Sequence, residues 1–237
     1  MQRSLCLALC LAALASKLAA QSIVLPANAA GVEGSDQNNF PWAFTANTFP
    51  GLRVQAVYDS SNLTSQGINW PITITGIRWR ANGGTLSNGG THGTATIALA
   101  SAAVDYTAVT TSFTGNQNGD YTVCYSGPVT VDPIPATTPG GWYVTVPLTT
   151  SFTYDPTLGN DLIIDTDNIL GNWTGGSLAP HDVAGAGSMS SRVIASTNYP
   201  TANTVTQDHG IVVELLYCTG ELTTPPNFVS NYGAGTG

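Results

Sequence analysis

Aspartates are the residues of this sequence whose spacing points most directly to chemistry. Asp161, Asp165 and Asp167 lie within or next to an apolar run that is typical of a β-strand. Alternate residues of a strand point to the same side, so the three carboxylates are expected on one face. Carboxylate oxygens are preferred ligands of Ca²⁺, and the spacing therefore predicts a structural calcium site. The alternative is that these aspartates are turn residues and solvated strand positions.

Tryptophan offers a second kind of site. Four tryptophans lie next to proline, glycine or asparagine, where side chains project from loops; these are Trp42, Trp70, Trp142 and Trp173. A flat indole has an apolar face that packs against the apolar face of a sugar ring, so these residues predict carbohydrate binding. The competing interpretation places Trp79 and Trp142 in the core, with the other tryptophans covering the ends of the fold.

No catalytic residue is predicted. The sequence has no Gly-x-Ser-x-Gly motif, and neither Cys124 nor Cys218 has a neighbouring histidine. His92, His181 and His209 lack the short spacing of zinc ligands, and we expect them in surface loops. A hydrolase acting on glycans would need two facing carboxylates, which scattered aspartates would have to supply.

The first residues resemble a secretory signal peptide. Arg3 precedes an apolar run that extends to Ala15, and small residues come before a predicted cleavage site after Ala20. The run is too short to cross a membrane as a helix, so the mature chain is not expected to insert into one. We therefore expect residues 1–20 to be removed and the protein to be secreted or displayed on the outer cell surface.

The remaining chain has an unusual charge balance. It contains no lysine, and four arginines accompany fourteen acidic residues. Nucleic acids and anionic lipids bind clusters of basic residues, so neither is an expected partner. Thirty-two threonines indicate a β-rich surface covered with hydroxyl groups.

Two cysteines remain after the predicted cleavage. Cys124 and Cys218 would meet an oxidising compartment, where disulfides persist. This predicts a Cys124–Cys218 disulfide, with two separate thiols that pack as small apolar residues as the alternative.

Alternating apolar and polar residues predict an all-β protein. The expected strands cover residues 52–58, 72–81, 95–100, 121–125, 142–147, 162–165, 189–195 and 211–217. Glycine- and proline-rich turns separate them, while two longer connections suit strands that cross between sheets. We predict a jelly-roll-like antiparallel β-sandwich as a single domain over residues 21–221. Residues 222–237 read as a flexible linker or a truncated tail.

Several sequence blocks resemble a known group of proteins. They include Asn39-Phe40-Pro41-Trp42 and the segments 53–59, 110–116 and 162–165. These blocks resemble secreted bacterial β-sandwich proteins of Gram-negative and planctomycete-type genomes, which often carry a C-terminal sorting tail of the PEP-CTERM kind. The resemblance covers residues 36–218 and implies an extracellular or surface-attached protein without assigned catalytic residues. The sequence printed here shows no such tail before Gly237.

These observations lead to a ranked expectation of function. A secreted or cell-surface structural or adhesive protein comes first, and its partners would be extracellular glycans or components of the matrix or cell surface. A carbohydrate-binding, lectin-like module, stabilised by Ca²⁺, is the alternative. A hydrolase that acts on glycans is third.

Overall fold

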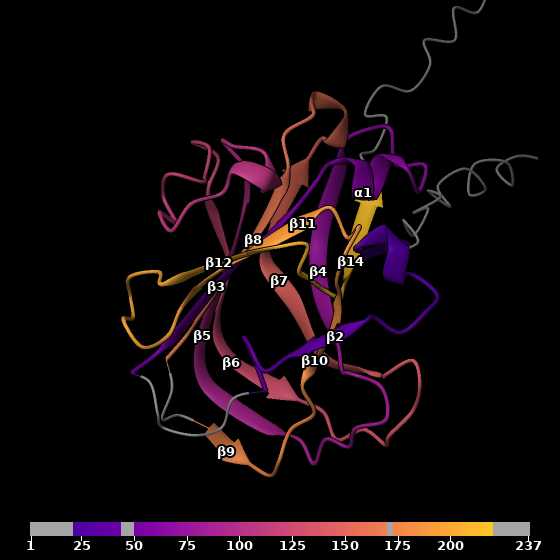
Figure 1. Cartoon of the computed structure of the whole chain (residues 1–237), viewed down its shortest axis with the longest axis vertical. Helices are drawn as coiled ribbons and strands as arrows, with labels where there is room; N and C mark the ends of the chain where they lie inside the picture. Colours follow the sequence, from indigo (N-terminus) through magenta and orange to yellow (C-terminus); the bar gives the residue numbers. More distant parts are fainter. Residues whose placement is uncertain (1–20, 44–49, 170–172, 220–237) are drawn as a thin grey trace, which may run out of the picture.

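Strands dominate the computed structural model, which describes residues 21–43, 50–169 and 173–219 (Figure 1). The strands are β1 (Gln21–Leu25), β2 (Asp36–Asn38), β3 (Leu52–Tyr58), β4 (Ile72–Arg80), β5 (Gly90–Ser101), β6 (Thr122–Val131), β7 (Trp142–Tyr154), β8 (Leu162–Asn168), β9 (Trp173–Gly175), β10 (His181–Ala184), β11 (Ser190–Ala195), β12 (Thr204–Gln207), β13 (Gly210–Ile211) and β14 (Val213–Thr219). The short helix α1 (Ser61–Thr64) and three 3₁₀ turns, Ala27–Ala29, Tyr106–Ala108 and Pro156–Leu158, complete the described elements.

The chain folds as the jelly-roll-like antiparallel β-sandwich that its strand pattern predicts. Each of the eight predicted strands is present, and β5, β6 and β7 extend well beyond the predicted ranges. The predicted signal peptide and C-terminal tail lie outside the described residues. No described helix is long and apolar enough to cross a membrane.

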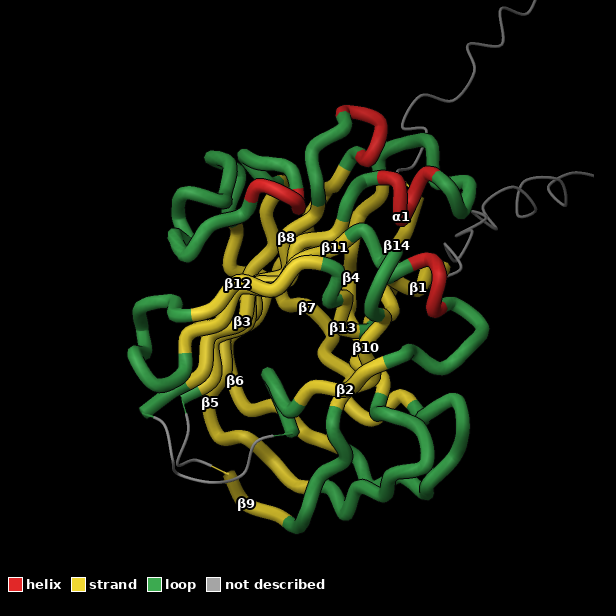
Figure 2. The backbone as a smooth tube through the Cα atoms, viewed as in Figure 1, coloured by secondary structure: helices red, strands yellow, loops and turns green. Residues whose placement is uncertain are grey.

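One large sheet curls around the core (Figure 2). Its strand order is β1-β14-β4-β7-β6-β5-β8-β3-β11-β12, and β9 adds to β5. A small sheet, β13-β10-β2, lies beside it, and every recorded pairing is antiparallel. Neighbours in the large sheet are often distant in sequence, since β3 lies between β8 and β11. Such crossovers bring side chains of remote segments onto common faces.

Both faces of the large sheet are covered over part of its area. Val54 and Tyr58 of β3 face the main core, where Trp79 and Ile97 also lie. Val57, on the opposite face, packs with Phe113 and Ile163 in a second cluster outside the sheet. This explains why β3 is buried on both sides although its sequence alternates between apolar and polar residues.

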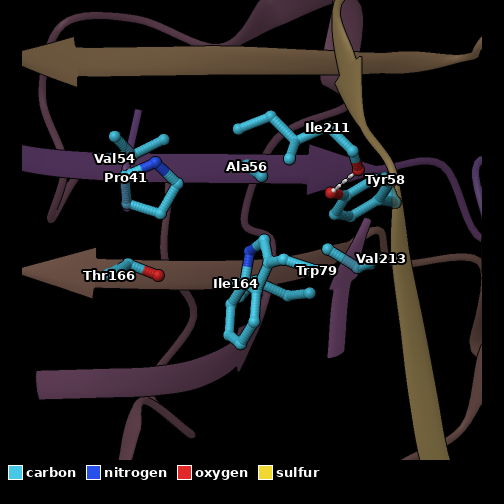
Figure 3. A pocket seen from close by; sticks show the side chains of 9 residues that line it. All are labelled: Pro41, Val54, Ala56, Tyr58, Trp79, Ile164, Thr166, Ile211 and Val213. Carbon is cyan, nitrogen blue, oxygen red and sulfur yellow. Dashed lines mark hydrogen bonds between the residues drawn. The ribbon is translucent and has the colours of Figure 1, made fainter. Parts of the chain in front are cut away.

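The main core is filled by side chains and encloses only a very small space. A cavity of about 10 Å³ remains beside Pro41, Trp79 and Thr166 (Figure 3). This is room for about one water molecule. The cavity is therefore too small to bind an organic ligand.

The predicted Cys124–Cys218 disulfide is absent, and both cysteines are free thiols. Cys124 is on β6 and Cys218 is on β14, and strands β7 and β4 lie between them in the sheet. Strands are spaced about 4.8 Å apart, so three steps separate the two by roughly 14 Å. Disulfide formation needs Cα atoms within about 7 Å. Cys124 is buried, and burial raises the pKa of its thiol.

Candidate functional site

The predicted sugar-binding tryptophans do not form one exposed platform. Trp42 is fully buried and packs edge-on against Trp79 with ring centroids 5.3 Å apart, so the prediction is wrong for Trp42. Trp173 packs against the ring of His92, and Trp142 lies beside the guanidinium of Arg80. Trp70 is the most exposed of the four, at 43%.

The three histidines are buried, so their predicted place in surface loops is wrong. His181 Nε2 accepts a hydrogen bond from the Trp42 backbone amide, and His181 Nδ1 lies 3.0 Å from the Tyr143 hydroxyl. This pattern requires a neutral ring protonated on Nδ1, because the amide occupies the lone pair of Nε2. Burial accordingly lowers the pKa of His181 to about 3.

His92 fixes the same segment from another side. Its Nε2 lies 2.8 Å from the Trp42 carbonyl oxygen. Because a carbonyl oxygen can only accept a hydrogen bond, Nε2 must carry the proton. Its Nδ1 then accepts from Asn168, which also donates to the Pro41 carbonyl. The two histidines therefore hold residues 41–42 in the core and act as structural residues.

The predicted calcium ligands are separated by the fold. Arg53 binds Asp165 through two hydrogen bonds of 2.9 and 2.8 Å, and the Tyr199 hydroxyl donates to Asp167. Asp161 precedes β8 and is four residues from Asp165, a span of roughly 13 Å on an extended chain. The three therefore do not form a common ion site.

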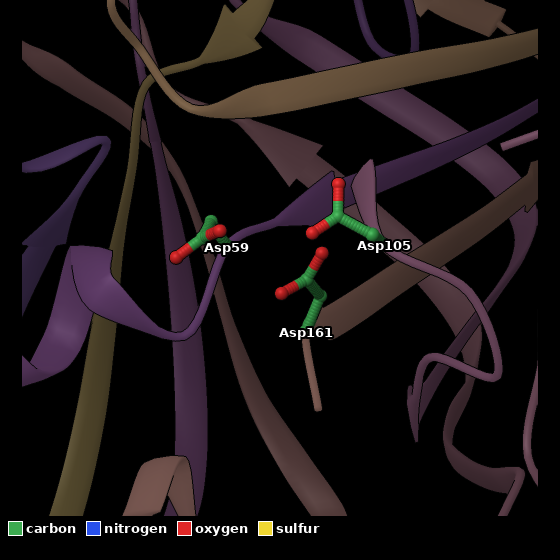
Figure 4. A group of neighbouring side chains, drawn as sticks. All are labelled: Asp59, Asp105 and Asp161. Atoms are coloured by element: carbon green, nitrogen blue, oxygen red, sulfur yellow. The ribbon is translucent and has the colours of Figure 1, made fainter. Parts of the chain in front are cut away.

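Asp161 instead joins two aspartates that the sequence pattern did not single out. One carboxylate oxygen from each of Asp59, Asp105 and Asp161 lies within 4.8 Å of the others (Figure 4). Asp161 accepts hydrogen bonds from the amides of Ser60 and Tyr106. Burial, together with the nearby charges of Asp59 and Asp105, raises the pKa of Asp161 to about 6. A divalent cation would relieve the same repulsion.

A groove of about 390 Å³ lies on the surface of the described residues. Three remote segments form its walls: residues 33–37, residues 82–83 and Thr138. Its polar lining side chains are Glu33, Ser35, Asp36, Gln37, Asn82 and Thr138. The size falls within the range of small-molecule sites, although the lining is far more polar than usual.

Hydrogen bonds preform the groove. Both carboxylate oxygens of Glu33 accept backbone amides, from Gly83 and from Gly140. The Gly34 amide donates to Asp182, and Ser35 accepts from the Gly185 amide. A side chain at Gly34 would overlap the Val183 carbonyl oxygen, so this close approach requires glycine. The walls are thus fixed without a ligand.

The chemistry of the groove is that of polar recognition. Asp36 and Gln37 are exposed and supply carboxylate and amide groups, while Asn82 and Thr138 add an amide and a hydroxyl. Glu33 is committed to two backbone amides, whereas Asp36 is exposed and accepts only the Gln37 amide among the described residues of the groove, so Asp36 is the more accessible carboxylate. No cationic side chain lines the groove, which therefore disfavours anionic ligands.

Comparisons with known proteins give no relative. No family model matches the chain, and no curated protein or solved structure matches it significantly. The assignment of function therefore rests on the groove and on the chemistry of the residues described above.

Proposed function

We propose that this protein is a secreted or cell-surface adhesive β-sandwich that makes contact through carbohydrate. The groove is the observation that carries this proposal. It combines carboxylate, amide and hydroxyl groups in a preformed space of about 390 Å³. Sugars present many hydroxyl groups that both donate and accept hydrogen bonds, and these groups match that lining.

The charge pattern narrows the ligand class. The groove contains acidic but no basic side chains, and the whole chain has a net charge of −8. Sulfated or uronic acid polymers would be repelled, so neutral or amino sugars are the favoured ligands. The leader-like start and the resemblance to secreted, surface-sorted β-sandwich proteins support an extracellular location.

Calcium enters the proposal in a structural role. Its ligands would be Asp59, Asp105 and Asp161, so that Asp59 and Asp105 replace Asp165 and Asp167 of the set that the sequence spacing indicated. The ion would join the turn after β3 to the loop after β5 and to the start of β8. It would thus stabilise the fold at a site separate from the carbohydrate groove.

Substitutions in the groove test the proposal. Asp36→Asn combined with Gln37→Ala removes exposed groups, and each lost hydrogen bond is expected to weaken binding about fivefold to tenfold. Binding is measured by calorimetry with hexasaccharides of β-1,4-linked glucose, mannose and N-acetylglucosamine. Gln21→Ala, at an exposed position of β1, serves as the control. Failure of the unaltered protein to bind any of these sugars would overturn the carbohydrate function.

A further inference from the structure

A row of polar side chains crosses the outer face of the large sheet, apart from the groove. Register pairs Arg53 of β3 with Asp167 of β8, Asp167 with Thr96 of β5, and Thr96 with Ser126 of β6. Directly opposite residues share one face, so these four side chains form a continuous row, here called the polar ladder. Four strands about 4.8 Å apart give it a length of roughly 14 Å.

The Arg53 end of the polar ladder is rigid. The guanidinium binds the buried carboxylate of Asp165 through Nε and Nη2, and it lies 4.3 Å above the Phe113 ring. Asp165 also accepts hydrogen bonds from Gln55 and Gln117. The Tyr121 hydroxyl also interacts with this guanidinium, and the Arg53 side chain remains 21% exposed. A fixed donor is therefore presented at the surface.

Asp167 presents an acceptor next to this donor. Its Oδ1 accepts the Tyr199 hydroxyl at 2.9 Å, which orients the carboxylate, and among the described residues no side chain or amide donates to Oδ2. A donor and an acceptor on directly paired residues are complementary to two adjacent hydroxyls of a sugar ring, one accepting and the other donating.

An exposed aromatic ring borders the polar ladder. Tyr121 is 38% exposed, and its hydroxyl interacts with the Arg53 guanidinium. Val123 of β6 is 49% exposed and is paired with Ala98 of β5, two residues along that strand from Thr96 of the polar ladder. An aromatic ring beside polar groups is suited to the apolar face of a pyranose.

We propose that the polar ladder, bordered by Tyr121, is a second carbohydrate-binding site that takes an extended neutral oligosaccharide. The length of the ladder suits several linked sugars, in contrast to the compact groove. The inference rests on the proposed function for the class of ligand, and it adds a separate surface. With two sites on one chain, a single molecule could join two glycan strands.

Two variants test the ladder without removing a buried group. Tyr121→Ala removes the exposed ring, and Asp167→Asn keeps an acceptor for Tyr199 while removing the charge. Each should weaken the binding of the hexasaccharides named above about tenfold, as expected for loss of a charge-assisted hydrogen bond or a stacking contact. The thermal midpoint should not change. Arg53 is left intact, because its loss would leave Asp165 buried without its ionic partner.

Matched controls separate this inference from the proposed function. Arg78→Gln alters another arginine on an exposed strand face, paired with Glu214, and Trp70→Ala removes an exposed aromatic ring. Both should bind normally. If the unaltered protein binds a hexasaccharide but both ladder variants bind it equally well, the ladder inference is overturned while the carbohydrate function stands. If the unaltered protein binds none of the sugars, both proposals fail.

Discussion

His181 illustrates how single residues of this protein are committed to structure. Its ring accepts from the Trp42 amide and contacts the Tyr143 hydroxyl, so it must stay neutral in the fold. The low folded pKa, about 3, means that the unfolded chain binds a proton more readily between about pH 3 and 6.5. Stability should therefore fall as the pH is lowered through this window.

Urea unfolding at several pH values checks this expectation. The unaltered protein should lose up to about 1.4 kcal/mol per pH unit from His181 between pH 6.5 and 4.5. His181→Gln retains an acceptor for the Trp42 amide and should show a shallower slope. An equal slope in the variant would show that His181 does not titrate as described.

Asp161 responds to pH in the opposite sense. Because its folded pKa is raised to about 6, the folded protein binds a proton more readily than the unfolded chain, and acidification from about pH 6 towards 4 favours the fold through this residue. Calcium needs the ionised carboxylate. We therefore expect Ca²⁺ to raise the thermal midpoint at pH 7.5 and to lose this effect below pH 6.

A chelator titration measures the calcium effect. Replacing Ca²⁺ by excess EDTA at pH 7.5 should lower the midpoint of the unaltered protein but leave that of Asp105→Asn nearly unchanged. Asp155→Asn, which alters an aspartate outside the triad, should behave like the unaltered protein. Equal thermal midpoints with and without Ca²⁺ would show that calcium does not stabilise the fold.

At the scale of the elements, a buried ion pair between Arg80 and Asp182 holds residues 29–34 in place. Arg80, at the end of β4, binds Asp182 of β10 through two of its nitrogens and donates to the carbonyls of Ala29 and Val32. Asp182 also accepts the Gly34 amide. This pair thus connects the large sheet, the small sheet and the first wall of the groove.

Breaking this pair should be costly. Asp182→Ala leaves the Arg80 guanidinium buried and uncompensated, which should lower the free energy of unfolding by about 3–5 kcal/mol. Glu214→Ala breaks the more exposed pair with Arg78 and should cost only about 0–1 kcal/mol. Chemical denaturation of the two variants provides the comparison. Similar losses would contradict the structural role of the buried pair.

At the scale of the whole molecule, local sequence patterns predict where the strands lie in the chain but not which strands pair with one another in the sheet. The alternation of residues 52–58 and 72–80 reflects a face that lies on the core, so β3 and β4 were predictable. β2 and β10 have only three and four residues and follow no clear alternation. The predicted disulfide failed because the order of β6 and β14 within the sheet depends on crossovers.

The candidate sites could not be predicted from local sequence patterns either, because their residues come from segments that are far apart in the sequence. Residues 33–37, 82–83 and Thr138 meet only after folding, and the polar ladder requires the register of four strands. Trp42 was misjudged because Pro41 indicated a loop, whereas hydrogen bonds with two histidines that are remote in sequence, one accepting and one donating, hold this loop in the core. Asp161 was singled out from the sequence as a calcium ligand, but the aspartates that lie near it, Asp59 and Asp105, come from other turns.

Chemical-shift mapping tests the central claim of carbohydrate contact most directly. The full chain, labelled with ¹⁵N, is titrated with the hexasaccharides named above while the backbone amide signals are followed. We expect saturable shifts at Gly34 and Gly83 in the groove, with no change at Gly67 and Gly159 in remote turns. Shifts confined to residues around Trp70, or no shifts with any of these sugars, would contradict it.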